Sequence, residues 1–128
     1  MMGYGVLNYH FFGCGFIEML MVGEHCRRRG IGLALIAALK SRCRHPKLFT
    51  STNRSNLPMQ RLLLNAGFIA SGQVDNLDDG DPEQVFFYPS WERKNRHSPL
   101  GVSNERQGEV QNLIIIAVTV VLSVYPAA

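Results

Sequence analysis

Apolar positions at the start of the chain gather in two short runs, "MGYGVLNYHFF" and "GFIEMLMV". Both runs are β-prone, and a glycine-containing link at residues 13–15 separates them. Two such runs around a short glycine link predict a β-hairpin. The second run ends at Val22, and residues 23–29 form a polar connection.

From Gly32 onward the apolar positions follow a helical pattern. The residues at three- and four-residue spacing are Leu35, Ile36, Leu39 and Cys43. This spacing predicts a helix with one buried face, which ends before Pro46. Residues 47–53, "KLFTSTN", are short and β-prone, and they predict a strand.

A second helix is predicted after this strand, because both of its ends carry clear signals. Asn56 is a typical N-cap, Pro58 falls in the first turn, and Gly67 suits a left-handed C-terminal cap. The residues expected on its buried face are Met59, Leu62, Leu63 and Ala66. "FIASGQV" and "VFFYP" then predict two further strands, separated by a turn-rich acidic loop.

The predicted order is strand, strand, helix, strand, helix, strand, strand. This order indicates an α/β (α+β) domain in which helices pack on a mixed sheet. Residues 1–89 are expected to form that domain. Residues 90–112 are charged and polar without a sustained period, which indicates a disordered tail. Residues 113–128 form an apolar C-terminal segment whose role the sequence leaves open.

The two ends of the sequence were tested for a secretory signal and for a membrane-spanning segment. The N-terminal run is interrupted by polar residues and does not fit a secretory signal. The apolar run at residues 113–125 is shorter than the ~20 residues of a membrane-spanning helix. Its β-branched residues suit a strand better than a helix. Contact with a membrane through this run is therefore the less favoured interpretation.

Composition narrows the chemistry only modestly. The 128 residues carry a formal charge of +3, which permits an anionic ligand but does not argue for nucleic acid. Cys14, Cys26 and Cys43 are odd in number and show no CxxC spacing, which favours free thiols in the cytoplasm. His25 and His45 lie near two of them, but the spacing fits no common zinc pattern, so no metal is expected.

Three consecutive arginines, Arg27–Arg29, stand just before the glycines that open the first predicted helix. Cations are unfavourable at a helix N-terminus, which carries the positive end of the helix dipole. Gly30 and Gly32 would let backbone N–H groups approach a ligand, and the helix end adds unpaired donors. Together these features predict a site for an anion such as a pyrophosphate.

Two motifs resemble the GNAT superfamily of acyl-CoA-dependent N-acyltransferases. "RRRGIG", residues 27–32, is similar to the family's Gln/Arg-x-x-Gly-x-Gly/Ala loop between a strand and a helix. "NLPMQRLLLNAGF", residues 56–68, is similar to its Asn-x-x-Ala-x-x-x-Tyr-x-x-x-Gly-Phe segment. The resemblance covers residues 3–88 and implies a mixed, mostly antiparallel sheet flanked by helices.

The resemblance implies acetyl-CoA as co-substrate and assigns its binding residues. The loop that would hold the CoA pyrophosphate consists of Arg27, Arg28, Arg29, Gly30, Ile31 and Gly32. The backbone of Leu20, Met21 and Val22 would pair with the pantetheine arm. Asn56 would hydrogen-bond the cofactor as well as cap its helix.

Catalytic groups are harder to assign. Glu18 lies on the strand that enters the site, where relatives often carry a glutamate, and strand alternation predicts that it shares a face with Phe16 and Leu20. It is the candidate base, although a solvated surface role remains open; His25 is a weaker candidate. Leu63 occupies the position where many relatives have a tyrosine that protonates the departing CoA thiolate as a general acid, and leucine cannot donate a proton. Tyr88 or a water would have to replace it.

The chain also starts late relative to the family, which usually has a strand, two helices and a strand before this hairpin. We therefore expect a domain that is incomplete at its N-terminus, with an exposed strand edge. An altered reading frame or a fragment of a longer protein would explain the difference.

The sequence thus predicts an N-acetyltransferase that moves acetyl from acetyl-CoA to a primary amine in a ternary complex. The alternative is a catalytically degenerate fragment that only binds acyl-CoA. A nucleic-acid binder is not favoured, because no aromatic platform adjoins the basic cluster. The amine acceptor, a small molecule or a peptide, is not specified. An acidic loop at residues 75–83 could attract it, and a homodimer is left open.

Overall fold

The computed structural model describes residues 2–27, 29–90 and 114–117 of the chain. The elements are β1 (Gly3–Phe11), β2 (Cys14–Val22), a 3-10 turn (Glu24–Cys26), α1 (Ile31–Arg42), β3 (Leu48–Asn53), α2 (Leu57–Asn65), β4 (Ile69–Val74), β5 (Glu83–Tyr88) and β6 (Ile114–Ala117). The predicted order of strands and helices over residues 3–88 is confirmed.

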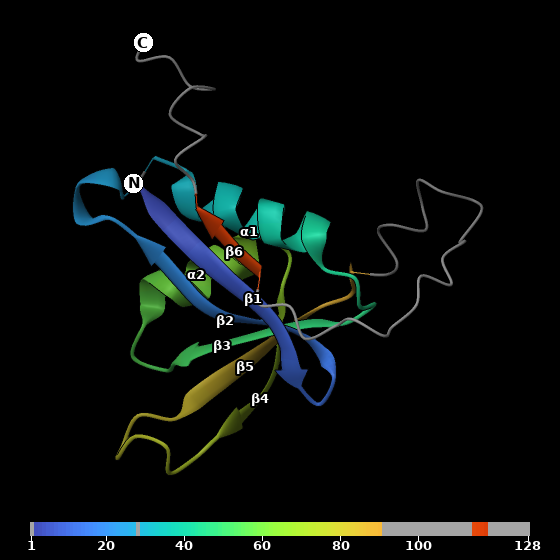
Figure 1. The fold of residues 1–128 in the computed structure, drawn as a ribbon. Helices are drawn as coiled ribbons and strands as arrows, with labels where there is room; N and C mark the ends of the chain where they lie inside the picture. Colours follow the sequence, from blue (N-terminus) through green and yellow to red (C-terminus); the bar gives the residue numbers. More distant parts are fainter. Residues whose placement is uncertain (1, 28, 91–113, 118–128) are drawn as a thin grey trace.

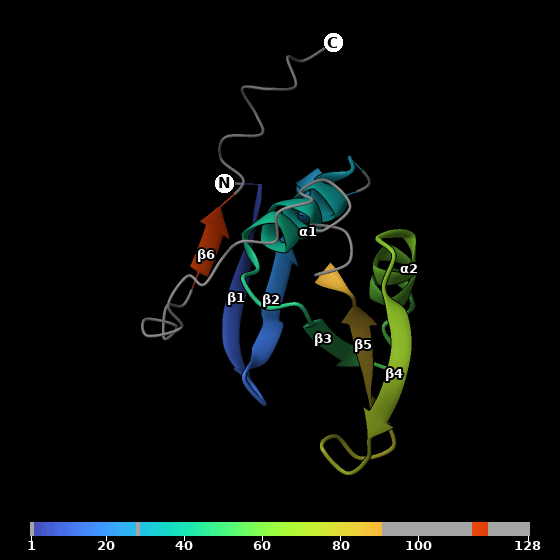
Figure 2. The ribbon, with the colours of Figure 1, turned by 90° about the vertical axis from the view of Figure 1, so that its right-hand side faces the viewer.

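The strands form one six-stranded sheet in the order β4-β5-β3-β2-β1-β6. Figure 2 shows the strands side by side in this order. The pairing of β2 with β3 is parallel, and the other pairings are antiparallel. The α1 helix connects the two parallel strands, as a parallel pair requires. The mixed, mostly antiparallel sheet with helices is therefore confirmed.

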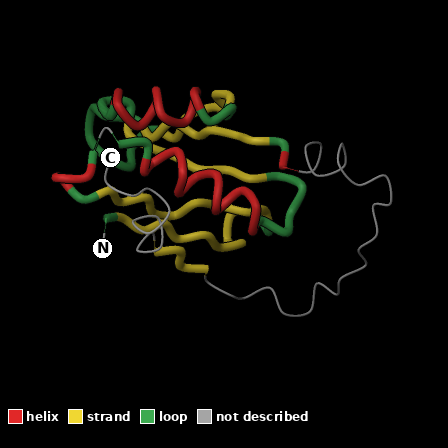
Figure 3. Tube along the Cα trace, turned by 90° about the horizontal axis from the view of Figure 1, so that it is seen from above, coloured by secondary structure: helices red, strands yellow, loops and turns green. Residues whose placement is uncertain are grey.

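Both helices pack on the same face of the sheet. Ile36 and Leu39 of α1 and Leu63 of α2 belong to one core cluster with inward-facing strand residues such as Leu7 and Leu48. In Figure 1 strands β1 and β2 pass in front of α2, and Figure 3 shows the two helices side by side. The opposite face carries no helix within the described residues.

Glycines allow α1 to approach the sheet closely. A Cβ added to Gly5 would lie 2.7 Å from Leu39 Cδ1, and one added to Gly15 would lie 2.5 Å from Cys43 Sγ. Both distances are too short for a real Cβ contact, so the Leu39 and Cys43 side chains or the helix that carries them would have to shift. The apolar face predicted for α1 is confirmed, because Leu35, Leu39 and Cys43 are each 0% exposed.

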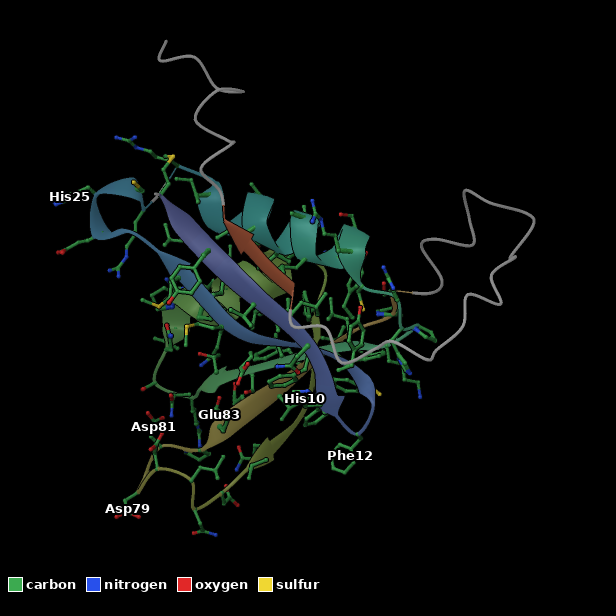
Figure 4. The ribbon with its side chains drawn as sticks, viewed as in Figure 1. His10, Phe12, His25, Asp79, Asp81 and Glu83 are labelled. Carbon is green, nitrogen blue, oxygen red and sulfur yellow. The ribbon has the colours of Figure 1, made fainter. Side chains whose placement is uncertain are left out.

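The β1–β2 hairpin turns over two residues, Phe12 and Gly13. Both have positive φ, 53° and 78°, which is the geometry that matches the twist of a tight hairpin. The turn therefore lies one residue earlier than the link at 13–15 that the sequence suggested. Phe12 is 90% exposed at its tip, and Figure 4 shows its ring pointing away from the sheet.

The edge of β1 is covered by a strand from the far end of the chain. Residues 114–117 pair antiparallel with β1, from Leu7↔Ile114 to Tyr4↔Ala117. The expectation of an exposed edge is wrong for Tyr4–Leu7, because a distant β-branched segment pairs with these residues; the described residues provide no such partner for positions 8–11 of β1. The strand preference of that segment is confirmed for residues 114–117, whereas the rest of the expected tail, residues 91–113 and 118–128, lies outside the described residues. Neither described helix is long and apolar enough to span a membrane.

Candidate functional site

The N-terminus of α1 lies beside the C-terminal end of β2. Ile31, the first residue of the helix, forms a small apolar cluster with Met2 and Leu35, against which Leu20 and Val22 of β2 pack. Gly23 donates its backbone N–H to the Met2 carbonyl at 2.7 Å, which fixes the chain as it leaves the strand. The start of α1 and residues 20–22 of β2, both of which the sequence assigned to binding of acyl-CoA, are therefore neighbours.

Gly30 caps α1 in a conformation that favours glycine. Its φ is 77°, and its carbonyl accepts the first helical hydrogen bond from Ala34 N–H at 3.0 Å. No side chain caps this end. The backbone N–H groups of Ile31, Gly32 and Leu33 precede that first bond, so they have no partner in the helix and can donate to an anion.

Two arginines of this loop lie at the surface. Arg27 and Arg29 are exposed, whereas Arg28 lies outside the described residues. Exposed cations next to a helix N-terminus add to its positive potential rather than offset it. This electrostatic arrangement suits a ligand of high negative charge.

Gly32 has a different reason to be glycine. A Cβ at this position would lie 2.8 Å from Leu62 Cδ2, so the absent side chain lets α1 and α2 approach each other. The sequence interpretation assigned Gly32 to the ligand alone and missed this packing role. Leu62 of the second motif thus rests on Gly32 of the first, and the two motifs are in contact.

Strand β2 changes character halfway along its length. It pairs with β3 only from Gly15↔Leu48 to Ile17↔Thr50, and the Thr50 hydroxyl donates to the Ile17 carbonyl at 3.0 Å at the last pair. Beyond this point Figure 1 shows the two strands diverging. Residues 18–22 keep only β1 as a partner among the described strands.

A β-bulge marks the point of divergence. Leu7 pairs with Ile17 and Val6 with Met19, so Glu18 is one extra residue on β2. The alternation of side chains between the two faces of the sheet is shifted by one residue across this bulge. Phe16 stacks on Phe11 on the outer face of the sheet, whereas Leu20 packs toward the helices. The prediction that Glu18 shares a face with both Phe16 and Leu20 is therefore wrong, because a bulge breaks the two-residue period.

The Glu18 carboxylate is exposed and has a fixed partner. Its Oε2 accepts a hydrogen bond from Asn8 Nδ2 at 3.0 Å. Asn8 pairs with Phe16 across the hairpin, so Glu18 lies on the outer face with Phe16. Sequence reasoning missed Asn8, because an asparagine within an apolar strand gave no motif to identify it.

Asn56 caps α2 as predicted. Its Oδ1 accepts the backbone N–H of Met59 at 3.2 Å, and its side chain is exposed. Gly67 ends the helix region with φ 91°, as expected. Of the four residues assigned to the buried face, Leu63 is fully buried, whereas Met59, Leu62 and Ala66 are only partly buried.

The alternative acid, Tyr88, and the alternative base, His25, lie in different surroundings. The ring of Tyr88 belongs to the core with Leu63, and Lys40 Nζ lies 3.9 Å from its centroid. His25 is exposed in the loop after β2, as Figure 4 shows. No group of three or more His, Cys, Asp or Glu side chains in the described ranges could hold a metal ion.

The acidic loop between β4 and β5 is tied to the end of β3. Asp81 accepts hydrogen bonds from both the backbone N–H and the hydroxyl of Ser55, at 2.9 and 2.6 Å. Asn53 Nδ2 donates to Asp78 Oδ2 at 2.7 Å. Figure 4 shows Asp79 and Asp81 together on this loop. Asp78 and Asp81 therefore have structural partners at and just after the end of β3, which the charge run alone did not indicate.

Comparisons with known proteins agree with this arrangement. The model of the acetyltransferase (GNAT) family matches residues 1–68, which include both motifs. A solved GNAT-family acetyltransferase from Bacillus cereus is 40% identical, with a TM-score of 0.66, over 68% of this chain and 61% of that one. A search of the curated proteins returned no match.

Two more distant structures share the fold. Arabidopsis thaliana NAA60 in complex with acetyl-CoA is 25% identical, with a TM-score of 0.51, over 58% of this chain and 46% of that one. Ard1 from Thermoplasma volcanium is 23% identical, with a TM-score of 0.54, over 58% of this chain and 53% of that one.

This chain spans less than two thirds of the length of these solved relatives. The part that it shares with the family nevertheless includes the bulged β2, the glycine loop and both helices. Because the family match extends over more than half of the residues, the chain belongs to the GNAT family of acetyltransferases.

Proposed function

We propose that this chain moves an acetyl group from acetyl-CoA to a primary amine by direct attack within a ternary complex. The observation that carries the proposal is the juxtaposition of two backbone surfaces. The uncapped N-terminus of α1 adjoins the half of β2 that has no partner on its β3 side. One surface offers N–H donors to an anion, and the other offers strand-like hydrogen bonding to an extended chain.

The donor set fits a pyrophosphate. The free N–H groups of Ile31 to Leu33 converge at one helix end, and Arg27 and Arg29 add positive charge from the surface. A Cβ added at Gly30 would meet no heavy atom within 4 Å, so the space around this cap is open to a ligand. We assign Arg27 to Gly32, including Arg28 by its place in the motif, to this role.

The second half of β2 suits the pantetheine arm. The backbone of Leu20, Met21 and Val22 can pair with amide groups of an extended ligand in the manner of an added strand. Asn56, at the start of α2, would hydrogen-bond the co-substrate with the amide N–H groups that capping leaves unused. The acetyl thioester would then lie near the bulge at Glu18.

The chemistry at the bulge follows from these positions. The lone pair of the neutral amine attacks the thioester carbonyl, a C–N bond forms, and a backbone N–H near Leu20 stabilises the oxyanion. The C–S bond then breaks, and CoA leaves as a thiolate. Glu18, directly or through a water, takes the proton that the amine loses. The thiolate is protonated from solvent, because the position of the family's tyrosine holds the buried Leu63.

The second candidate is binding of acyl-CoA without turnover. Leu63 favours it, because this side chain is 0% exposed in the core and supplies no proton. Thiolates are fair leaving groups without assistance, so the loss of an acid is expected to slow transfer rather than abolish it. Release of free thiol in the presence of amines distinguishes the two candidates.

The test combines calorimetry with acetyl-CoA and a thiol-release assay over a panel of primary amines. Gly30→Asp places a side chain and a negative charge at the helix cap, at a conformational cost of about 1–2 kcal/mol. We expect affinity for acetyl-CoA to fall roughly tenfold or more. Gly13→Asp is the matched control, because Gly13 has φ 78°, is exposed and is equally open, but lies at the opposite end of β2.

Three outcomes are distinct. Loss of binding in Gly30→Asp but not in Gly13→Asp, with thiol release by the unaltered chain, supports transfer. Binding without thiol release selects the second candidate. Absence of any binding of acetyl-CoA by the unaltered chain contradicts both.

A further inference from the structure

Asn8 is the only side chain that the described residues place in hydrogen-bonding contact with Glu18. It lies in the middle of β1, opposite Phe16 of β2, and is only 4% exposed. Buried polar side chains in a strand are costly unless their hydrogen bonds are satisfied. The position of Asn8 next to an exposed carboxylate therefore requires an explanation.

Both polar atoms of the Asn8 side-chain amide make hydrogen bonds. Its Oδ1 accepts the backbone N–H of His10 at 3.1 Å, while its Nδ2 donates to Glu18 Oε2 at 3.0 Å. A backbone N–H can only donate, so the end that faces His10 must be the oxygen. The NH₂ group must therefore face Glu18, and the orientation of the amide is determined by the backbone.

The bulge makes such a partner necessary. Glu18 is the extra residue of β2, so it has no cross-strand neighbour directly opposite on β1. A glutamate in that position has three side-chain torsions with little packing to restrict them. One hydrogen bond from a rigid, buried donor holds one carboxylate oxygen and leaves the other free to accept a proton.

The chemical type of the partner matters as well. Lysine or arginine at this position would stabilise the carboxylate and weaken it as a base. An amide orients the carboxylate through a single hydrogen bond and places no positive charge beside it. This combination is what a positioned general base requires.

We propose that Asn8 is a positioning residue that holds Glu18 in the orientation from which it accepts the proton of the acceptor amine. The inference rests on the proposed acetyl transfer and on Glu18 as its base. Asn8 itself would not touch substrate. Its contribution is to kcat, through Glu18, and not to the binding of acetyl-CoA.

Two variants of Asn8 separate its two hydrogen bonds. Asn8→Asp keeps an oxygen for His10 N–H but turns an acceptor toward Glu18. Asn8→Leu keeps the branched shape and the number of side-chain heavy atoms but removes both hydrogen bonds, and it is the second variant if a buried aspartate prevents folding. For each variant we expect kcat for amine acetylation to fall roughly tenfold, with KM for acetyl-CoA within about twofold of the unaltered value.

The decisive measurement is a double-mutant comparison with Glu18→Gln. If Asn8 acts through Glu18, Asn8→Leu causes no further loss of kcat in the Glu18→Gln background. Tyr4→Phe is the matched control, because it lies on the same strand and removes a hydroxyl bond to Met19 Sδ without affecting Glu18. We expect its kcat to be unchanged.

The outcomes separate the two levels of the proposal. An equal loss of kcat from Asn8→Leu with and without Glu18→Gln would overturn the positioning role, as would an unchanged kcat or an effect confined to KM. Absence of turnover by the unaltered chain, despite binding of acetyl-CoA, would overturn the proposed transfer and the positioning role with it.

Discussion

The two halves of β2 are built for different purposes. The first half, Cys14–Ile17, is hydrogen-bonded to β1 on one side and to β3 on the other. Gly15 and Ile17 are buried against the helices. The second half, residues 18–22, keeps β1 but diverges from β3, and its side chains are exposed or only partly buried.

Under the proposed function, one strand would serve both stability and ligand binding. Unpaired backbone groups are unfavourable when buried, but they are available to a ligand when they lie at the surface. A single extra residue at Glu18 separates the two halves and moves Leu20 back toward the core. The bulge therefore lets residues 18–22 diverge from β3 while they stay paired with β1 and Leu20 stays packed toward the helices.

The largest expected effect is on stability, in the paired half. Ile17→Ala removes a side chain that is 3% exposed within the main core cluster, so we expect the free energy of unfolding to fall by about 3 kcal/mol. Met19→Ala, in the other half, removes a side chain that is 44% exposed and should change it by about 0.5 kcal/mol or less. Chemical denaturation measures both; equal losses would show that the halves do not differ.

The next effect is on activity, at the boundary. Glu18→Gln preserves size but removes the base, so we expect kcat for amine acetylation to fall roughly a hundredfold. The free energy of unfolding should change by less than about 0.5 kcal/mol, because the side chain is exposed. An unchanged kcat across the amine panel would remove Glu18 from the mechanism.

The smallest effect concerns the last hydrogen bond between β2 and β3. Thr50→Val deletes the hydroxyl that donates to the Ile17 carbonyl, which should cost about 1 kcal/mol of stability. Thr52→Val is the control on the same strand. Thr52 is also buried, but its hydroxyl makes no hydrogen bond to β2 within the described residues. If both variants lose the same stability, the contact at Ile17 does not hold the strands together where they diverge.

Local signals explain why so much of the fold was predictable. The caps at Asn56 and Gly67 depend on a few neighbouring residues, and both are in the predicted conformation. The apolar spacing of α1 reports directly on which side faces the sheet. The glycine at the start of α1 was also predictable, since a glycine at positive φ before a helix depends only on local backbone geometry, whereas the anion site there stays a prediction.

Features that depend on distant residues were not predictable in the same way. The bulge at Glu18 arises from its pairing with β1 and leaves no mark in a two-residue period. Gly32 is explained by Leu62, thirty positions away, and the hydrogen bonds of Asp81 by Ser55. Asn8 acquires a role only once the hairpin brings Glu18 beside it.

The strand at residues 114–117 has a consequence for how the protein is made. Its partner, β1, is synthesised at the start of the chain, whereas β6 follows β5 by more than twenty residues. At a translation rate of roughly ten residues per second, the β1 edge waits for its partner for a few seconds after β5 has emerged. During that interval a strand from another nascent chain could add to β1 in place of β6, so the speed of synthesis between β5 and β6 should influence the yield of correctly paired chains.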